Sequence, residues 1–179
     1  MPNAINALKN THQRRIAARL DQLSPWIGRL WSGTNEDCFP RDVIATWRKT
    51  DGVPDPDQLI PGRTRLGHGP FAFDFQQWDG RTWRVTFERP GMKGWHGFDL
   101  LPGPDGTLLA HTIEADLDGR SLLLWHLLIA PVHDWAVEAM LDRIQEALST
   151  GVAPQHTTRP MTLAARVAFF VLKKAARRI

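Results

Sequence analysis

The sequence predicts an α+β domain in which an antiparallel sheet precedes a long amphipathic helix. Two features support this class: period-two alternation of apolar and polar residues between residues 71 and 117, and helical periodicity between residues 120 and 150. The third feature is the order of these segments along the chain. Strands grouped ahead of a helix are typical of α+β domains, whereas strands and helices alternate in α/β domains.

The predicted strands form a meander. Residues 71–76 and 82–88 alternate on either side of Asp79-Gly80, and an Asp-Gly pair between alternating runs is a strong hairpin signal. Residues 94–101 and 107–117 alternate again around a Pro- and Gly-rich turn. We therefore expect an antiparallel sheet with one buried face and one face in water.

The long helix has one continuous apolar face. That face contains Val137, Met140, Leu141, Ile144 and Leu148, whereas the residues expected to face solvent are Glu138, Asp142, Arg143 and Glu146. Gly151 is expected to end the helix. The part before Pro131, LLLWHLLI, is either a first helical half joined at a proline kink or a final buried strand, and helix is favoured. Asp134 is expected to cap the second half.

The segments before the meander carry weaker signals. Residues 1–10 are expected to be an N-terminal extension, residues 12–18 an edge strand, and residues 20–30 a short amphipathic helix interrupted by Pro25. Acidic residues between 36 and 57 surround a short element at 42–49; they lack the spacing of a calcium loop, so a solvated loop is favoured. Arg63, Arg65 and His68 resemble an anion loop, but a surface connection is favoured.

Bulk properties limit the function classes. A chain of 179 residues with 42% hydrophobic and 23% charged residues fits one globular domain. Its single cysteine, Cys38, excludes an intramolecular disulfide and a cysteine-based zinc site, and it fits a cytoplasmic location. We expect no signal peptide and no spanning helix.

Charge is distributed unevenly along the chain. Residues 156–179 carry six basic and no acidic residues; subtracting these six charges from the net +3 of the chain leaves −3 for residues 1–155. The basic balance therefore belongs to the tail, and a nucleic-acid partner is not predicted.

Three segments resemble the START-like superfamily (SRPBCC, polyketide cyclase/dehydrase), and the match is best in a largely uncharacterised bacterial branch. They are GHGPFAFDFQQWDGRTWRVTF at 67–87, WHGFDLLPGPDGTLLAHTIEA at 95–115 and LLWHLLIAPVHDWAVEAMLDRIQEAL at 123–148. The resemblance covers residues 11–150, which gives a domain flanked by 1–10 and 151–179. It implies a helix-grip fold, in which a curved sheet wraps a C-terminal helix around a cavity, and binding of an apolar or amphipathic small molecule such as a lipid, a polyketide or an aromatic compound. Members differ in whether they catalyse a reaction, so an enzyme is not implied.

The expected ligand-binding residues lie on the apolar strand faces: Trp83, Val85, Phe87, His96, Phe98, Leu100, His111 and Ile113. If Leu101 pairs with Leu108, His96 and His111 become diagonal neighbours. The two histidines are candidates for orienting a ligand or for acid–base catalysis, and the alternative is a hydrogen-bonded structural pair. No third ligand accompanies them, so no metal site is predicted. No P-loop, dinucleotide fingerprint or hydrolase motif occurs, so no cofactor is expected.

The tail is predicted to form a separate helix capped by Thr162. Its apolar stripe contains Leu163, Val167, Phe170 and Val171, and basic residues follow. One interpretation is an interfacial helix through which residues 160–179 make peripheral contact with the inner membrane face. The alternative is a helix docked on its own domain or on a second copy.

Overall fold

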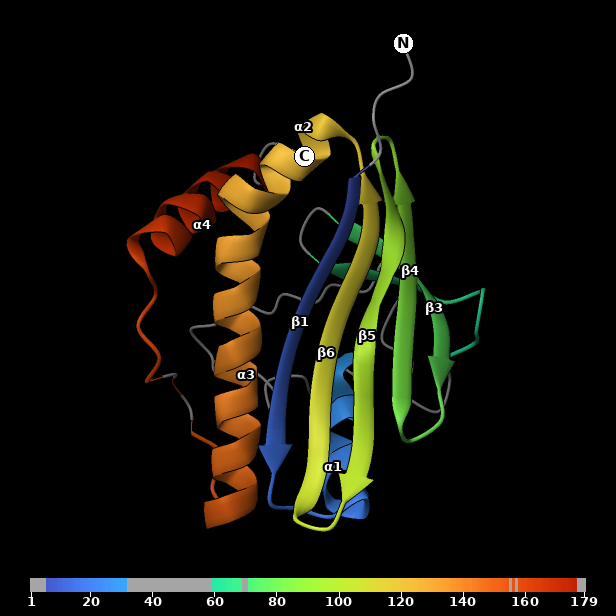
Figure 1. The fold of residues 1–179 in the computed structure, drawn as a ribbon, viewed down its shortest axis with the longest axis vertical. Coiled ribbons are helices and arrows are strands. Elements are labelled where there is room, and N and C mark those ends of the chain that lie inside the picture. Colours follow the sequence, from blue (N-terminus) through green and yellow to red (C-terminus); the bar gives the residue numbers. More distant parts are fainter. Residues whose placement is uncertain (1–5, 32–58, 69–70, 155, 157, 177–179) are drawn as a thin grey trace.

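The structure is a computed structural model that describes residues 6–31, 59–68, 71–154, 156 and 158–176 (Figure 1). The acidic segment between 36 and 57, the short element at 42–49 and Cys38 lie outside these residues, as do residues 1–5.

Six antiparallel strands form one sheet in the order β1-β6-β5-β4-β3-β2. Their bounds are β1 Asn6–Ile16, β2 Arg65–His68, β3 Phe71–Trp78, β4 Thr82–Arg89, β5 Met92–Gly103 and β6 Gly106–Leu117. The predicted meander is therefore confirmed, with β1 returning from the start of the chain to lie beside β6. Strands β2 to β6 follow one another in space as they do in sequence.

The hairpin turns explain the strand boundaries. After β3, the Asp79 carboxylate accepts hydrogen bonds from the backbone N–H groups of Arg81 and Thr82 at 2.9 and 2.8 Å, and Gly80 takes a positive φ of 84°. Between β5 and β6, ladder pairing continues to Gly103 and Gly106, so both strands are longer than predicted. Gly106 has a φ of 114°, which an L side chain rarely adopts.

β1 is an edge strand, as predicted, but it begins earlier. Asn6 pairs with Leu117 and the ladder continues to Ile16 opposite Thr107, so residues 6–10 belong to the sheet. At the opposite edge, residues 65–68 form β2 rather than a surface connection or an anion loop. Leu66 explains this difference, because it is fully buried and lies opposite Phe73 in the ladder.

Two helices cover the inner face of the sheet. α1 Leu20–Gly28 lies behind the end of β5 and the start of β6 in Figure 1, and α3 Ala130–Thr150 runs along β1. Buried residues of both helices join those of the sheet in one hydrophobic core. α1 continues through Pro25, so the predicted interruption is wrong. The missing proline N–H leaves only the carbonyl of Asp21 without its helical partner, and Asp21 lies in the exposed first turn.

The predicted helix before Pro131 is confirmed. It consists of α2 Gly119–Leu124, capped by Asp118, and a wide π-helical turn, Trp125–Ile129, that leads into α3. Gly151 ends α3 with a φ of 77°, as predicted. Asp134 does not cap the second half: α3 starts after Ile129, and no side chain caps it. Arg143 is buried, not solvent-facing, because α3 is covered on more than one side.

The tail forms α4 Leu163–Ala176, which packs against α3 and the π-helical turn (Figure 1). Thr162 caps it as predicted, since its Oγ1 accepts a hydrogen bond from the Ala165 N–H at 3.2 Å. α4 buries its small residues, Ala165 and Ala168. The predicted apolar stripe of Leu163, Val167, Phe170 and Val171 is exposed, with Leu163 and Phe170 exposed to 78% and 68%. No described helix is both long and apolar enough to cross a bilayer.

Candidate functional site

The two predicted histidines are neighbours on the inner face of the sheet. The ladder places Leu101 opposite Leu108, Phe98 opposite His111 and His96 opposite Ile113, which is the predicted register. As a result, the ring centroids of His96 and His111 are 5.7 Å apart. The remaining predicted lining residues surround them on β4, β5 and β6, and all are buried. That these side chains contact a ligand stays a prediction.

Aromatic rings enclose both histidines. The ring of His96 lies 4.6 Å from that of Phe73, and the ring of His111 lies 4.6 Å from that of Phe98. His111 is only 2% exposed, and its Nδ1 has no hydrogen-bond partner among the described residues. Burial, reinforced by the neighbouring His133 and His96, holds the pKa of His111 well below its ordinary value. His111 is therefore neutral near pH 7.

Two further histidines extend this pair, and sequence reasoning did not bring them together. His12 lies directly opposite His111 in the β1–β6 ladder, and His133 approaches from the first turns of α3. The ring centroid of His133 is 5.1 Å from that of His111 and 5.8 Å from that of His12. Four histidines from β5, β6, α3 and β1 thus form a connected group, which we call the histidine cluster.

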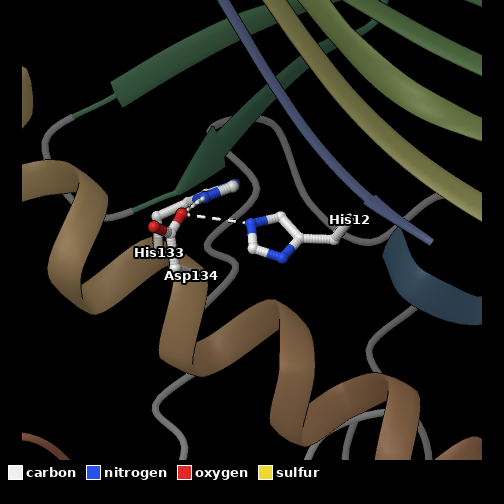
Figure 2. A group of neighbouring side chains, drawn as sticks. All are labelled: His12, His133 and Asp134. Atoms are coloured by element: carbon white, nitrogen blue, oxygen red, sulfur yellow. Dashed lines mark hydrogen bonds and ion pairs between the residues drawn. The ribbon is translucent and has the colours of Figure 1, made fainter. Parts of the chain in front are cut away.

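Asp134 connects the outer members of the histidine cluster (Figure 2). Its Oδ1 is 3.1 Å from His12 Nε2 and 3.2 Å from His133 Nδ1, and the second ring nitrogen of His12 is 2.9 Å from a carboxylate oxygen of Glu138. Burial alone would lower the pKa of His12, but hydrogen bonds to the two carboxylates outweigh it and raise the pKa above 6.5. For His133 burial prevails over the opposing effect of Asp134 and lowers the pKa.

The contacts of Asp134 and Glu138 belong to a longer row of ion pairs between β1 and α3. Arg14 donates hydrogen bonds to Glu138 at 2.8 Å and to Asp142 at 2.5 Å. From the linker before α4, Arg159 donates to Asp142 at 2.8 Å. The three acids are spaced four residues apart and so lie on one side of α3. We call this row the β1–α3 clasp. Glu138 and Asp142 therefore face cationic partners instead of open solvent.

The described surface hollows lie away from the histidine cluster. A groove of about 700 Å³ runs over the outer face of the sheet. It lies between two rows of side chains that cross neighbouring strands, one containing Trp95 and the other containing Lys93. A smaller one lies where Ala17–Leu20 meets the β5–β6 turn. Neither lies between the sheet and α3, where the described side chains of the inner face are buried in one hydrophobic core.

Solved structures share this architecture. Truncated norcoclaurine synthase from Thalictrum flavum is 15% identical, with a TM-score of 0.56 over 82% of this chain and 96% of that chain. The same enzyme in complex with dopamine and hydroxybenzaldehyde is 16% identical, with a TM-score of 0.55 over 84% of this chain and 91% of that chain. CalU16 from Micromonospora echinospora is 12% identical, with a TM-score of 0.50 over 99% and 98%.

Comparison of sequences adds no closer assignment. No protein-family model matches the chain, and no curated protein matches it. At these identities the likeness concerns the fold. A curved six-stranded antiparallel sheet closed by a long C-terminal helix, shared with these structures, shows that the chain has the predicted helix-grip fold.

Proposed function

We propose that the protein binds a small apolar or amphipathic molecule between the inner face of the sheet and α3. The observation that carries the proposal is the unpartnered Nδ1 of His111, held inside a wall of aromatic side chains. A buried polar atom without a partner costs free energy, and a ligand that supplies a hydroxyl or carbonyl group would recover it. The aromatic rings around His111 would make apolar contacts with the rest of such a molecule.

The class of ligand follows from the chemistry of this wall. A lipid, a polyketide or an aromatic compound with one polar group fits a surface that offers many apolar contacts and few hydrogen bonds. The norcoclaurine synthase complex supports the aromatic member of this set, because dopamine and hydroxybenzaldehyde are small aromatic molecules with polar groups. A cytoplasmic location is part of the proposal.

The packed inner face sets a condition on binding. The lining residues are buried, so a ligand needs α3 or its preceding segment to move away from the sheet. The π-helical turn is the suitable place for such a movement, since π-helical geometry is rare and is found mostly at functional sites. Native mass spectrometry and solvent extraction of the purified protein provide the first test. Recovery of no ligand from a protein with this filled face would overturn the proposal.

Replacement of His111 by leucine is expected to weaken ligand binding about tenfold, because one hydrogen bond of about 1–1.5 kcal/mol is lost at similar side-chain volume. The measurement is calorimetric titration with the extracted ligand, or with 4-hydroxybenzaldehyde as a probe. The matched control is His126→Leu, which changes an exposed histidine of the π-helical turn. Equal weakening by both variants, or by neither, would count against a role for His111.

A cyclase or dehydratase type of enzyme is the second candidate. It is favoured by the closeness of His96 and His111 inside an apolar surrounding, where a neutral imidazole can exchange a proton with a bound carbonyl compound. Turnover of the recovered ligand by the wild-type protein, absent in the His96→Gln, His111→Gln double variant, would distinguish an enzyme from a binding protein.

Peripheral membrane contact through residues 160–179 is a separate proposal, supported by the orientation of α4. The helix docks with its alanines and leaves Leu163, Val167, Phe170 and Val171 exposed, next to the π-helical turn with its exposed Leu127. Residues 156–179 contain no acid, which favours anionic lipid as the surface that covers them.

In liposome flotation, the full chain is expected to bind vesicles containing phosphatidylserine, and Phe170→Ser with Val167→Ser to reduce the bound fraction severalfold. Each substitution removes apolar area that would enter the interface, while the buried docking alanines stay in place. Leu101→Ser is the control, since Leu101 is as exposed but lies at the far end of β5. Equal flotation of all three proteins would overturn the proposal, and dimerisation lost in the α4 variant would identify a second copy as the occupant.

A further inference from the structure

The outer part of the histidine cluster has the donor set of a metal site. His12, His133 and Asp134 each contribute one ligand atom, and the three atoms lie within 4.8 Å of one another. Two of the separations are 3.1 and 3.2 Å, both to Asp134 Oδ1. Around a tetrahedral ion with bonds of about 2.0–2.1 Å, ligand atoms are roughly 3.3–3.5 Å apart. Both separations to Asp134 Oδ1 are therefore within a few tenths of an ångström of that spacing, and the two histidine nitrogens lie within 4.8 Å of each other.

Glu138 orients one of these donors. Its Oε1 lies 2.9 Å from His12 Nδ1, the nitrogen opposite the one that faces Asp134. A carboxylate on the far nitrogen of a metal-binding histidine fixes the ring orientation and makes the near nitrogen a better donor. His12 thus lies between one carboxylate that would share the ion with it and another that would support it from behind.

Asn10 offers a fourth donor. Its Nδ2 donates to Asp134 Oδ1 at 3.1 Å, and its own Oδ1 is buried without a hydrogen-bond partner among the described residues. A half-turn about the last side-chain bond exchanges the amide oxygen and nitrogen, which would direct the oxygen toward the same centre. An ion there would satisfy an oxygen that the present arrangement leaves unpaired.

The charges of the β1–α3 clasp accommodate a cation. Asp134, Glu138 and Asp142 contribute three negative charges, and the positive charges of Arg14 and Arg159 compensate two of them. One negative charge remains at the His12 end of the row. The side chains of His12, His133 and Asp134 are 13%, 18% and 42% exposed, so the centre can be reached from solvent.

We infer that His12, His133 and Asp134 bind a divalent first-row transition-metal cation of the zinc type, with Asn10 as the fourth donor and Glu138 as the supporting carboxylate. Two imidazoles and one carboxylate suit such an ion better than Mg²⁺ or Ca²⁺, which prefer oxygen ligands alone. The site adjoins the proposed ligand region through His133 and stands independently of that proposal, because its donors are complete without a ligand.

The test is calorimetric titration of the full chain, freed of metal by chelation, with Zn²⁺ alone. We expect one equivalent to bind with a micromolar or tighter dissociation constant, and the Co²⁺ form to show the intense visible absorption of low-coordinate cobalt. Asp134→Asn removes a charged donor at constant volume and is expected to weaken binding at least tenfold. Glu138→Gln is expected to weaken it about 10-fold or more as a supporting residue.

Controls separate metal binding from a purely structural ion pair. His126→Asn alters a histidine outside the group and is expected to leave the affinity unchanged. Circular dichroism checks that each variant is folded; if Asp134→Asn does not fold, His12→Gln replaces it in the comparison. Failure of the wild type to bind Zn²⁺, or binding that the donor variants leave unchanged, would overturn the inference and leave the group as an ion pair.

Discussion

Replacing Trp83 by alanine is expected to lower the free energy of unfolding by about 3–5 kcal/mol, the usual cost of deleting a large buried aromatic side chain. Trp83 is fully buried in the middle of the sheet. Its ring lies 5.9 to 6.3 Å from those of His96, Phe98 and Phe75. No small movement of these rings fills the volume that the indole leaves. Urea unfolding followed by circular dichroism measures the loss.

Trp95 provides a matched control on the opposite face of the sheet. It is half-buried, and the Arg84 guanidinium lies 4.3 Å from its ring centroid. Trp95→Ala should cost about 1 kcal/mol, mainly through the lost cation–π contact and part of its apolar area. If Trp83→Ala does not fold, Trp83→Phe replaces it in the comparison. Similar losses for Trp83→Ala and Trp95→Ala would contradict the assignment of the two faces.

Asp142→Asn is expected to reduce stability by about 1–2 kcal/mol at pH 7, and by much less at pH 3. Burial alone would raise the pKa of Asp142, but hydrogen bonds from Arg159 and Arg14 outweigh it and hold the pKa below its ordinary value of 3.8. The charged carboxylate therefore stabilises the folded state above pH 3.8, and this contribution is lost as the pH falls through the lower, folded-state pKa. The magnitude lies between that of an exposed ion pair and that of a buried charged hydrogen bond.

Urea unfolding of the wild type and the variant at several pH values between 2.5 and 7 would reveal this dependence. Glu146→Gln serves as the control, since it removes one negative charge from an exposed position of the same helix. A stability difference for Asp142→Asn that stays constant with pH would show that the charged form of Asp142 has no special role in the β1–α3 clasp.

The sequence predicts the meander and the register of β5 against β6 because both depend on neighbouring segments. Alternation within each strand identifies the buried face, and the turns at Asp79-Gly80 and Pro104-Asp105 determine which residues lie opposite each other. The proximity of His96 and His111 followed from one assumed pair, Leu101 with Leu108, which the ladder confirms. Local patterns were sufficient for this half of the histidine cluster.

The other half depends on contacts that no local pattern specifies. His12 and Asp134 are 122 residues apart, and they meet only because β1 pairs with β6 while α3 crosses beside it. The sequence predicts a helix-capping role for Asp134 because negative charge is favoured near a helix N-terminus. A signal was nevertheless present: acids recur every four residues on α3, while His12 and Arg14 recur every second residue on β1. Two complementary periodic charge rows predict a contact between elements.

The position of β1 has a consequence for how the chain folds during its synthesis. β1 is synthesised before the other strands of the sheet, yet its ladder partners on β6 are 91 to 111 residues away along the chain and its ion-pair partner Asp142 is 128 residues away. Until β6 and α3 have been synthesised, β1 has no ladder partner on either edge. Closure of such long-range contacts slows folding and leaves strand edges open to association with other chains. The last events of folding therefore involve the first strand of the sheet.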